Sequence, residues 1–177
     1  MSLLDLALWI QNTGWASDLR MSAYLYPVVL SSHLAGIALF GGAILATDLR
    51  LLGVTLRRLP VSDVVDQLRW PKRIGFLIVA TCGFLLASSK AEEYYYNPFF
   101  RAKLALFGLV AVHALAFRKS VYNNAAALDQ AKRIPGHAKL AATLSLILWI
   151  GIACAGRGIG YVEPPLDKLH AALSVLQ

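Results

Sequence analysis

Apolar residues along this chain gather in four long blocks separated by short polar and basic stretches. The blocks cover about residues 22–47, 74–89, 104–117 and 138–156. A helix needs roughly 17–25 mostly apolar residues to cross a bilayer. The first and fourth blocks are long enough alone, and the second and third become so if their helices continue into AEEYYY and RKSVYN. The pattern therefore predicts four spans, at about 22–47, 74–96, 99–121 and 138–157.

Composition agrees with a membrane protein. Of 177 residues, 58% are hydrophobic and 15% are charged, whereas charged residues make up roughly 25% of ordinary soluble domains. We expect an all-α integral membrane four-helix bundle that forms a single domain over residues 1–177. The N-terminal stretch LLDLALWI, within about residues 2–12, is expected to form a short amphipathic helix on the membrane interface.

Basic residues are concentrated in two loops, which hold eleven of the seventeen lysines and arginines. Those between the first two spans are Arg50, Arg57, Arg58, Arg69, Lys72 and Arg73; those between the last two are Arg118, Lys119, Lys132, Arg133 and Lys139. The positive-inside rule predicts that these loops are cytoplasmic and that both termini lie outside. The net charge of +7 then reflects the orientation of the chain in the membrane and does not indicate nucleic-acid binding. Asp48 and Arg50 are expected to close the first span at the cytoplasmic surface.

Two histidines lie inside apolar blocks, His33 in LSSHLAG and His113 in LVAVHALAF. An ionisable residue within a membrane span indicates a functional site, although a neutral histidine that bonds a neighbouring carbonyl or hydroxyl is the structural alternative. Two imidazoles on different helices of a bundle can serve as the axial ligands of a heme iron. We therefore predict one heme b between His33 and His113.

The depths of the two histidines test this pairing. His33 is thirteen residues past Arg20 and His113 is twelve past Arg101, so counting from the outer charges places them level. Counting from the inner charges separates them by ~15 Å, at the helical rise of ~1.5 Å per residue. The outer count is preferred, because the third helix is expected to continue past Arg118.

Other residues could support a heme. Gly36 lies close to His33 and leaves room for a flat macrocycle, and Arg157 could pair with a propionate from the outer end of the fourth span. The same residues could serve helix packing and anchoring to lipid headgroups. Neither HExxH nor CxxC occurs, and no Gly-rich phosphate loop precedes a helix, so the sequence favours neither metal-dependent hydrolysis nor phosphoryl transfer.

Three stretches, SSHLAGIALFGGAILATDLRLLG, NPFFRAKLAL and SLILWIGIACAGRGIGY, resemble a family of small bacterial four-helix membrane proteins of unknown function. The resemblance covers about residues 5–161 and implies the four-span fold and a bacterial cytoplasmic membrane. In overall plan alone, the chain also resembles cytochrome b561-type proteins and copper-resistance protein D-type membrane domains. It lacks the several histidine pairs of the former and the methionine-rich motifs of the latter.

The sequence thus predicts a multi-pass b-type cytochrome subunit in the bacterial inner membrane. It would pass electrons between the quinone pool and an extracytoplasmic partner, with other membrane or periplasmic redox subunits as neighbours. Two alternatives stay open. One is a cofactor-free accessory subunit of a larger membrane complex, and the other is a copper-handling membrane protein that uses His33.

Overall fold

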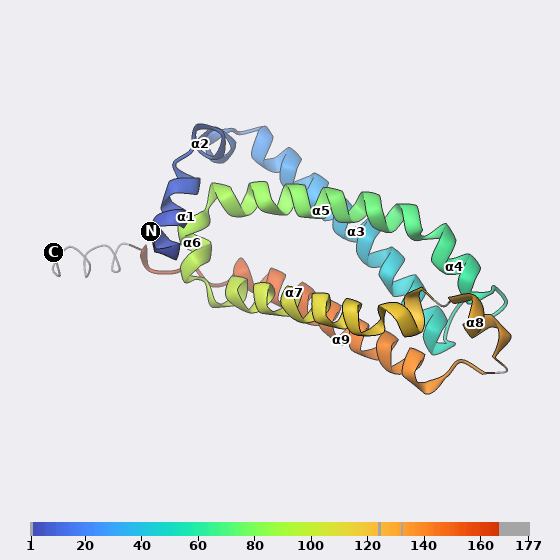
Figure 1. Cartoon of the computed structure of the whole chain (residues 1–177). Helices are drawn as coiled ribbons and strands as arrows, with labels where there is room; N and C mark the ends of the chain where they lie inside the picture. Colours follow the sequence, from blue (N-terminus) through green and yellow to red (C-terminus); the bar gives the residue numbers. More distant parts are fainter. Residues whose placement is uncertain (1, 124, 132, 167–177) are drawn as a thin grey trace.

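The computed structural model describes residues 2–123, 125–131 and 133–166, and all regular structure in these ranges is helical (Figure 1). The helices are α1 (Leu3–Gln11), α2 (Gly14–Met21), α3 (Leu25–Leu52), α4 (Val61–Gln67), α5 (Arg69–Ser89), α6 (Ala91–Tyr96), α7 (Pro98–Phe117), the π-helix η1 (Arg118–Tyr122), α8 (Ala125–Gln130) and α9 (Gly136–Ile159). Four of them are long and apolar enough to cross a membrane: α3, α5, α7 together with η1, and α9. The structure therefore supports the predicted all-α, four-span architecture.

Local signals explain where α7 begins. The Asn97 side chain accepts hydrogen bonds from the backbone N–H groups of Phe99 and Phe100, at 3.0 and 3.2 Å, and Pro98 occupies the first turn. Proline suits that position because its missing N–H would have no partner within the helix. The predicted continuation past Arg118 is also present, as η1.

The predicted second span is wrong at both ends. The chain breaks at Lys90, whose φ of −136° and ψ of 41° are not helical, so AEEYYY forms the separate helix α6. The span reaches its length in the opposite direction, through Arg69 to Arg73. Pro71 falls in the first turn of α5, where proline is tolerated.

The four long helices pack in the order α5, α3, α9, α7. Glycines allow the close approaches: a Cβ on Gly75 would lie 2.8 Å from the backbone nitrogen of Phe40, and one on Gly158 would lie 2.5 Å from the Phe99 ring. Close backbone approach drives helix association in lipid, where apolar burial gives little advantage. At the middle of the bundle, the rings of Phe40 and Trp149 meet edge to face with centroids 5.2 Å apart.

The two ends of the bundle differ, as Figure 1 shows. We call the end with α1, α2 and α6 the terminal end, and the end with α4 and α8 the basic end. At the terminal end, Arg20 donates to the Ser89 carbonyl at 2.9 Å and the Gln11 side chain accepts from the Glu92 backbone N–H at 3.0 Å. A helix is present where the interfacial segment is predicted, as α1, but its position on a membrane surface stays a prediction.

A hydrophobic core lies at the basic end. It is made of residues from α3, α4, η1, α8 and α9, namely Leu51, Val61, Val121, Ala125, Leu128, Ala138, Ala141 and Ala142. The basic residues of the two loops belong to the segments at this end of the bundle, and of these Lys132 lies outside the described residues. The loops are thus held in a folded cap, in which α4 packs against α8.

Candidate functional site

His33 projects from α3 against α5, at a point where α5 has a glycine. A Cβ on Gly83 would lie only 3.0 Å from Cε1 of the His33 ring, so a larger residue would displace the imidazole. The Nδ1 atom of His33 is buried and has no hydrogen-bond partner among the described residues, whereas the imidazole also has a hydrogen bond with the backbone of Val79 on α5. Buried polar atoms are nearly always bonded, so this nitrogen marks His33 as a place where something further could bind.

Lys103 brings a positive charge to the same level of the bundle. It is half-buried on α7, and its Nζ lies 3.5 Å from where a Cβ of Gly156 would stand on α9. Its ammonium group is close enough to His33 to act on the imidazole electrostatically, and it lies 5.9 Å from the centroid of the Phe107 ring. The surroundings of His33 therefore draw residues from all four long helices.

Gly36 serves packing between helices. A Cβ there would lie 2.8 Å from Cγ2 of Ile78 and 3.0 Å from Cγ2 of Val79, both on α5. Arg157 lies exposed at the terminal end of α9 and donates to the Tyr161 hydroxyl at 3.1 Å, with its guanidinium 5.0 Å from that ring. Each of these two predicted site residues thus has a structural contact of its own.

His113 occupies a different place, between α7 and the start of α9. Its Nε2 lies 2.9 Å from the carbonyl oxygen of Ala141. A carbonyl only accepts, so Nε2 carries the proton and donates it. The ring also packs on Phe117 and Tyr122, at centroid distances of 5.0 and 6.3 Å. This is the hydrogen-bonded histidine that the structural alternative describes.

The structure does not bring His33 and His113 together. Phe40 and Trp149 mark one common level. His33 lies seven residues from Phe40 toward the terminal end, and Ala141 lies eight residues from Trp149 toward the basic end. At ~1.5 Å per residue the two histidines are roughly 20 Å apart along the bundle. Two imidazole nitrogens that share one iron lie about 4 Å apart, because each metal–nitrogen bond is about 2 Å long. One heme ligated by both does not fit this geometry.

A second polar cluster lies toward the basic end and centres on Asp48. Its side chain is 1% exposed, within the bundle, so the expectation that it closes the span at the surface is wrong. The Ser145 hydroxyl on α9 hydrogen-bonds to the carboxyl group, and its Oδ2 has no partner among the described residues. Lys72 on α5 acts on it electrostatically but donates its own hydrogen bond to Thr47, at 2.7 Å.

The sequence contained a signal for this cluster. Thr47 and Asp48 follow an uninterrupted apolar run and precede a further apolar pair, Leu51 and Leu52. A helix that continues to Leu52 places Asp48 a full turn before its end. The carboxylate is therefore inside the span.

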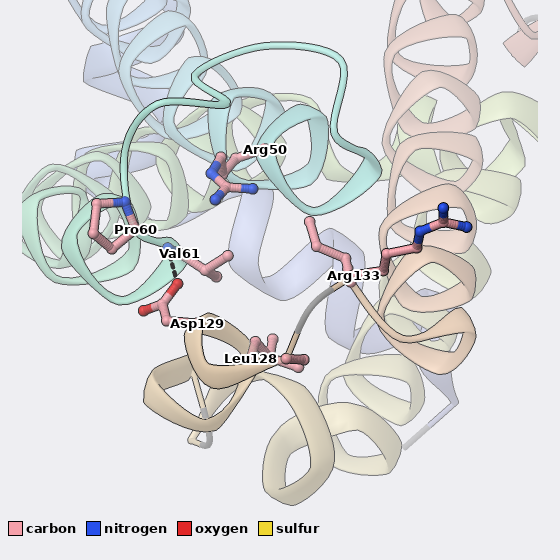
Figure 2. Close-up of a pocket in the computed structure, with 8 residues that line it drawn as sticks. Arg50, Pro60, Val61, Leu128, Asp129 and Arg133 are labelled. Carbon is pink, nitrogen blue, oxygen red and sulfur yellow. Dashed lines mark hydrogen bonds between the residues drawn. The ribbon is translucent and has the colours of Figure 1, made fainter.

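A pocket of about 320 Å³ opens at the basic end, between α4 and α8 (Figure 2). The Asp129 carboxylate accepts hydrogen bonds there from the backbone N–H groups of Val61 and Ser62, at the start of α4. Arg50 also lines it and donates from Nε to the Leu59 carbonyl at 2.8 Å. These contacts hold the cap together, and Asp129 takes up donors that could otherwise bind an anion.

Metal ligation has little support from this arrangement. Among the residues that the structure describes, no three His, Cys, Asp or Glu side chains come together as a metal site. Cys82 and Cys154 are both free thiols.

Comparison with known proteins gives a family and no function. Residues 21–162 match the family of unknown function DUF6644. The chain belongs to this family. No curated protein and no solved structure matches it. The DUF6644 region spans all four long helices and includes both polar clusters, whereas α1 precedes it. This result confirms the predicted resemblance to an uncharacterised family, and the chemistry rests on the residues alone.

Proposed function

We propose that this protein is a membrane redox subunit that binds one b-type heme through His33. The observation that carries the proposal is the unpartnered Nδ1 of an imidazole held within a membrane-spanning helix. Such a group is costly in an apolar setting unless it is bonded, and intramembrane ionisable residues generally mark functional sites. A neutral imidazole is a preferred axial ligand of heme iron.

A cation near His33 favours an anionic cofactor over a bare metal ion. Gly83 gives space to the His33 ring, and Gly156 gives space to the end of the Lys103 side chain. Lys103 supplies a cation at this level, where it could pair with a propionate. His113 is left out of the ligand set, because its Nε2 already bonds Ala141. A second axial ligand, if one is used, comes from elsewhere.

We place the terminal end outside and the basic end in the cytoplasm of a bacterial inner membrane. The concentration of lysine and arginine around α4 and α8 supports this orientation. His33 then lies in the outer half of the bilayer, which suits electron exchange with an extracytoplasmic partner. The quinone pool is the proposed partner within the membrane, a choice based on membrane redox logic alone.

The alternative of a cofactor-free accessory subunit has one specific observation in its favour. Three glycines on the long helices, Gly41, Gly42 and Gly108, have nothing within 4 Å of where a Cβ would stand. Small residues on open helix faces allow another helix to dock closely in lipid. A larger complex could use these faces whether or not a heme is bound.

Absorbance spectroscopy tests the proposal. The wild-type protein, His33→Ala and His113→Ala would be purified in detergent from heme-replete cells, and each spectrum recorded before and after dithionite. We expect Soret and α bands in the wild type and in His113→Ala, and their loss in His33→Ala. Adding imidazole to His33→Gly should restore a band, which a purely structural role of His33 would not produce.

The other outcomes are equally informative. A featureless wild-type spectrum would remove the heme proposal and favour the accessory subunit, which copurification of a stoichiometric partner would then support. Loss of the bands in a folded His113→Ala protein would show that both histidines ligate, and would overturn ligation by His33 without His113. Far-UV circular dichroism and size-exclusion profiles establish that each variant is folded.

A further inference from the structure

The Asp48 cluster lies outside the proposed redox site and needs an explanation of its own. Asp48 is 1% exposed and lies in α3, eight residues beyond Phe40 toward the basic end. At ~1.5 Å per residue this places it about 12 Å from the middle of the bundle, within the ~30 Å apolar thickness of a bilayer. A carboxyl group has therefore been built into the interior of a membrane-spanning bundle.

The charge of an ionised Asp48 is not balanced by a direct ion pair. The described residues contain two salt bridges, Asp66 with Arg69 and Glu93 with Lys90, and neither involves Asp48. Lys72 approaches it, but the lysine Nζ bonds the Thr47 hydroxyl instead. Burying an unpaired carboxylate is strongly unfavourable. A bound proton removes this cost, because the protonated carboxyl group carries no charge.

The neighbours of Asp48 can pass a proton on. Lys72 faces it from α5, Ser145 from α9 and Tyr122 from η1, which follows α7. The Ser145 hydroxyl hydrogen-bonds to both the Asp48 carboxyl and the Tyr122 side chain. The Tyr122 ring packs in turn on His113. Hydroxyl groups both donate and accept, so Ser145 and Tyr122 can form a short hydrogen-bonded chain with a neutral Asp48 carboxyl group.

We propose that Asp48 is a proton-binding site, which takes up a proton within the folded bundle at mildly acidic pH. Oδ2, the carboxyl oxygen without a partner, is the atom at which the proton resides. Ser145 and Tyr122 position the carboxyl group, and Lys72 limits how strongly the proton is held by favouring the ionised form. The site is independent of any heme at His33.

Infrared spectroscopy of the protein in lipid nanodiscs tests this directly. A protonated carboxyl group gives a C=O stretching band that is resolved from ionised carboxylates. We expect this band at mildly acidic pH, its shift on labelling with ¹³C-aspartate, and its loss as the pH is raised through neutrality. Asp48 is the only buried aspartate among the described residues, so the isotope shift identifies it without a mutation.

Variants complete the assignment. Asp48→Asn should abolish the band, whereas Asp63→Asn, which alters an exposed carboxylate on α4, should leave it unchanged. Absence of an aspartate-shifted band in the wild-type protein at mildly acidic pH would overturn the proposal, even if Asp48→Asn failed to fold. A band that persists in a folded Asp48→Asn protein would overturn the assignment as well. Both results are independent of whether a heme is present.

Discussion

The contact between Gly75 and Phe40 gives a quantitative test of how α3 and α5 pack. A Cβ added to Gly75 would lie 2.8, 2.9 and 3.0 Å from the N, Cβ and Cα atoms of Phe40. Ordinary Cβ contacts are 3.4 Å or longer. Two of the three atoms belong to the α3 backbone, so no rotamer change can relieve the clash. In Gly75→Ala the helices must separate by about half an ångström.

The expected cost follows from two opposing effects. Overpacking of this kind destabilises by about 1–3 kcal/mol, and separating the helices also weakens the contact between Phe40 and Trp149. Alanine has the higher helix propensity, which returns up to about 1 kcal/mol. The net loss for Gly75→Ala is therefore about 1–2 kcal/mol. A change of this size lowers the Tm of a chain of this length by roughly 2–8 °C.

Gly41→Ala is the matched control, because a Cβ at Gly41 has nothing within 4 Å. It makes the same chemical change in a transmembrane helix, without the clash. Thermal unfolding in detergent, followed by far-UV circular dichroism, should rank Gly75→Ala below the wild type and Gly41→Ala level with it or above. Equal Tm values for the two variants would refute the packing of α3 on α5 described here.

Two further changes test hydrogen bonds at the starts of helices. Asn97 caps α7 through its Oδ1 and donates from Nδ2 to the Ile159 and Val162 carbonyls. In the same unfolding assay, Asn97→Ala should therefore lower the free energy of unfolding by about 2–4 kcal/mol. Asn97→Ser keeps a capping oxygen and should lower it by about half as much. Slight burial raises the pKa of Asp129. Hydrogen bonds from the Ser62 hydroxyl and from two backbone N–H groups lower it by more, so the net pKa is below the usual value. Stability from ionised Asp129 is then present above pH about 4 and is lost as the pH falls through its folded-state pKa. Asp129→Asn should accordingly be less stable than the wild type by about 1 kcal/mol at neutral pH and by progressively less in acid; a gap that does not depend on pH would contradict the role assigned to this carboxylate.

The sequence predicted the spans well where local chemistry marks their limits. Asn97 and Pro98 fix the start of α7, and the structure shows the cap that they predict. The second span was misplaced because hydropathy favours extending an apolar block through tyrosines over extending it through arginines. The structure does the opposite, since the aliphatic parts of long basic side chains can lie along a helix near the bilayer surface.

The two polar clusters were predictable to different degrees. An ionisable residue in the middle of an apolar run identifies His33 without a structure. Pairing it with His113 required a common depth, and the count from the inner charges, which kept the two apart, agrees better with the structure than the outer count. Asp48 was missed for a related reason: a charge near the end of an apolar run was assigned to the surface, although α3 continues to Leu52.

The distance between these clusters keeps the two proposals separate. His33 and Asp48 lie on the same helix, fifteen residues apart, which is about 22 Å along α3. Charges at that distance interact weakly, and residues this far apart with no shared partner act independently. The rings of Phe40 and Trp149 lie between them and carry no titratable group. A proton at Asp48 therefore cannot serve as the direct charge partner of a ligand at His33. If redox and proton chemistry are coupled in this protein, the coupling must run through a rearrangement of α3 against α5 and α9, whose packing the Gly75 variant perturbs.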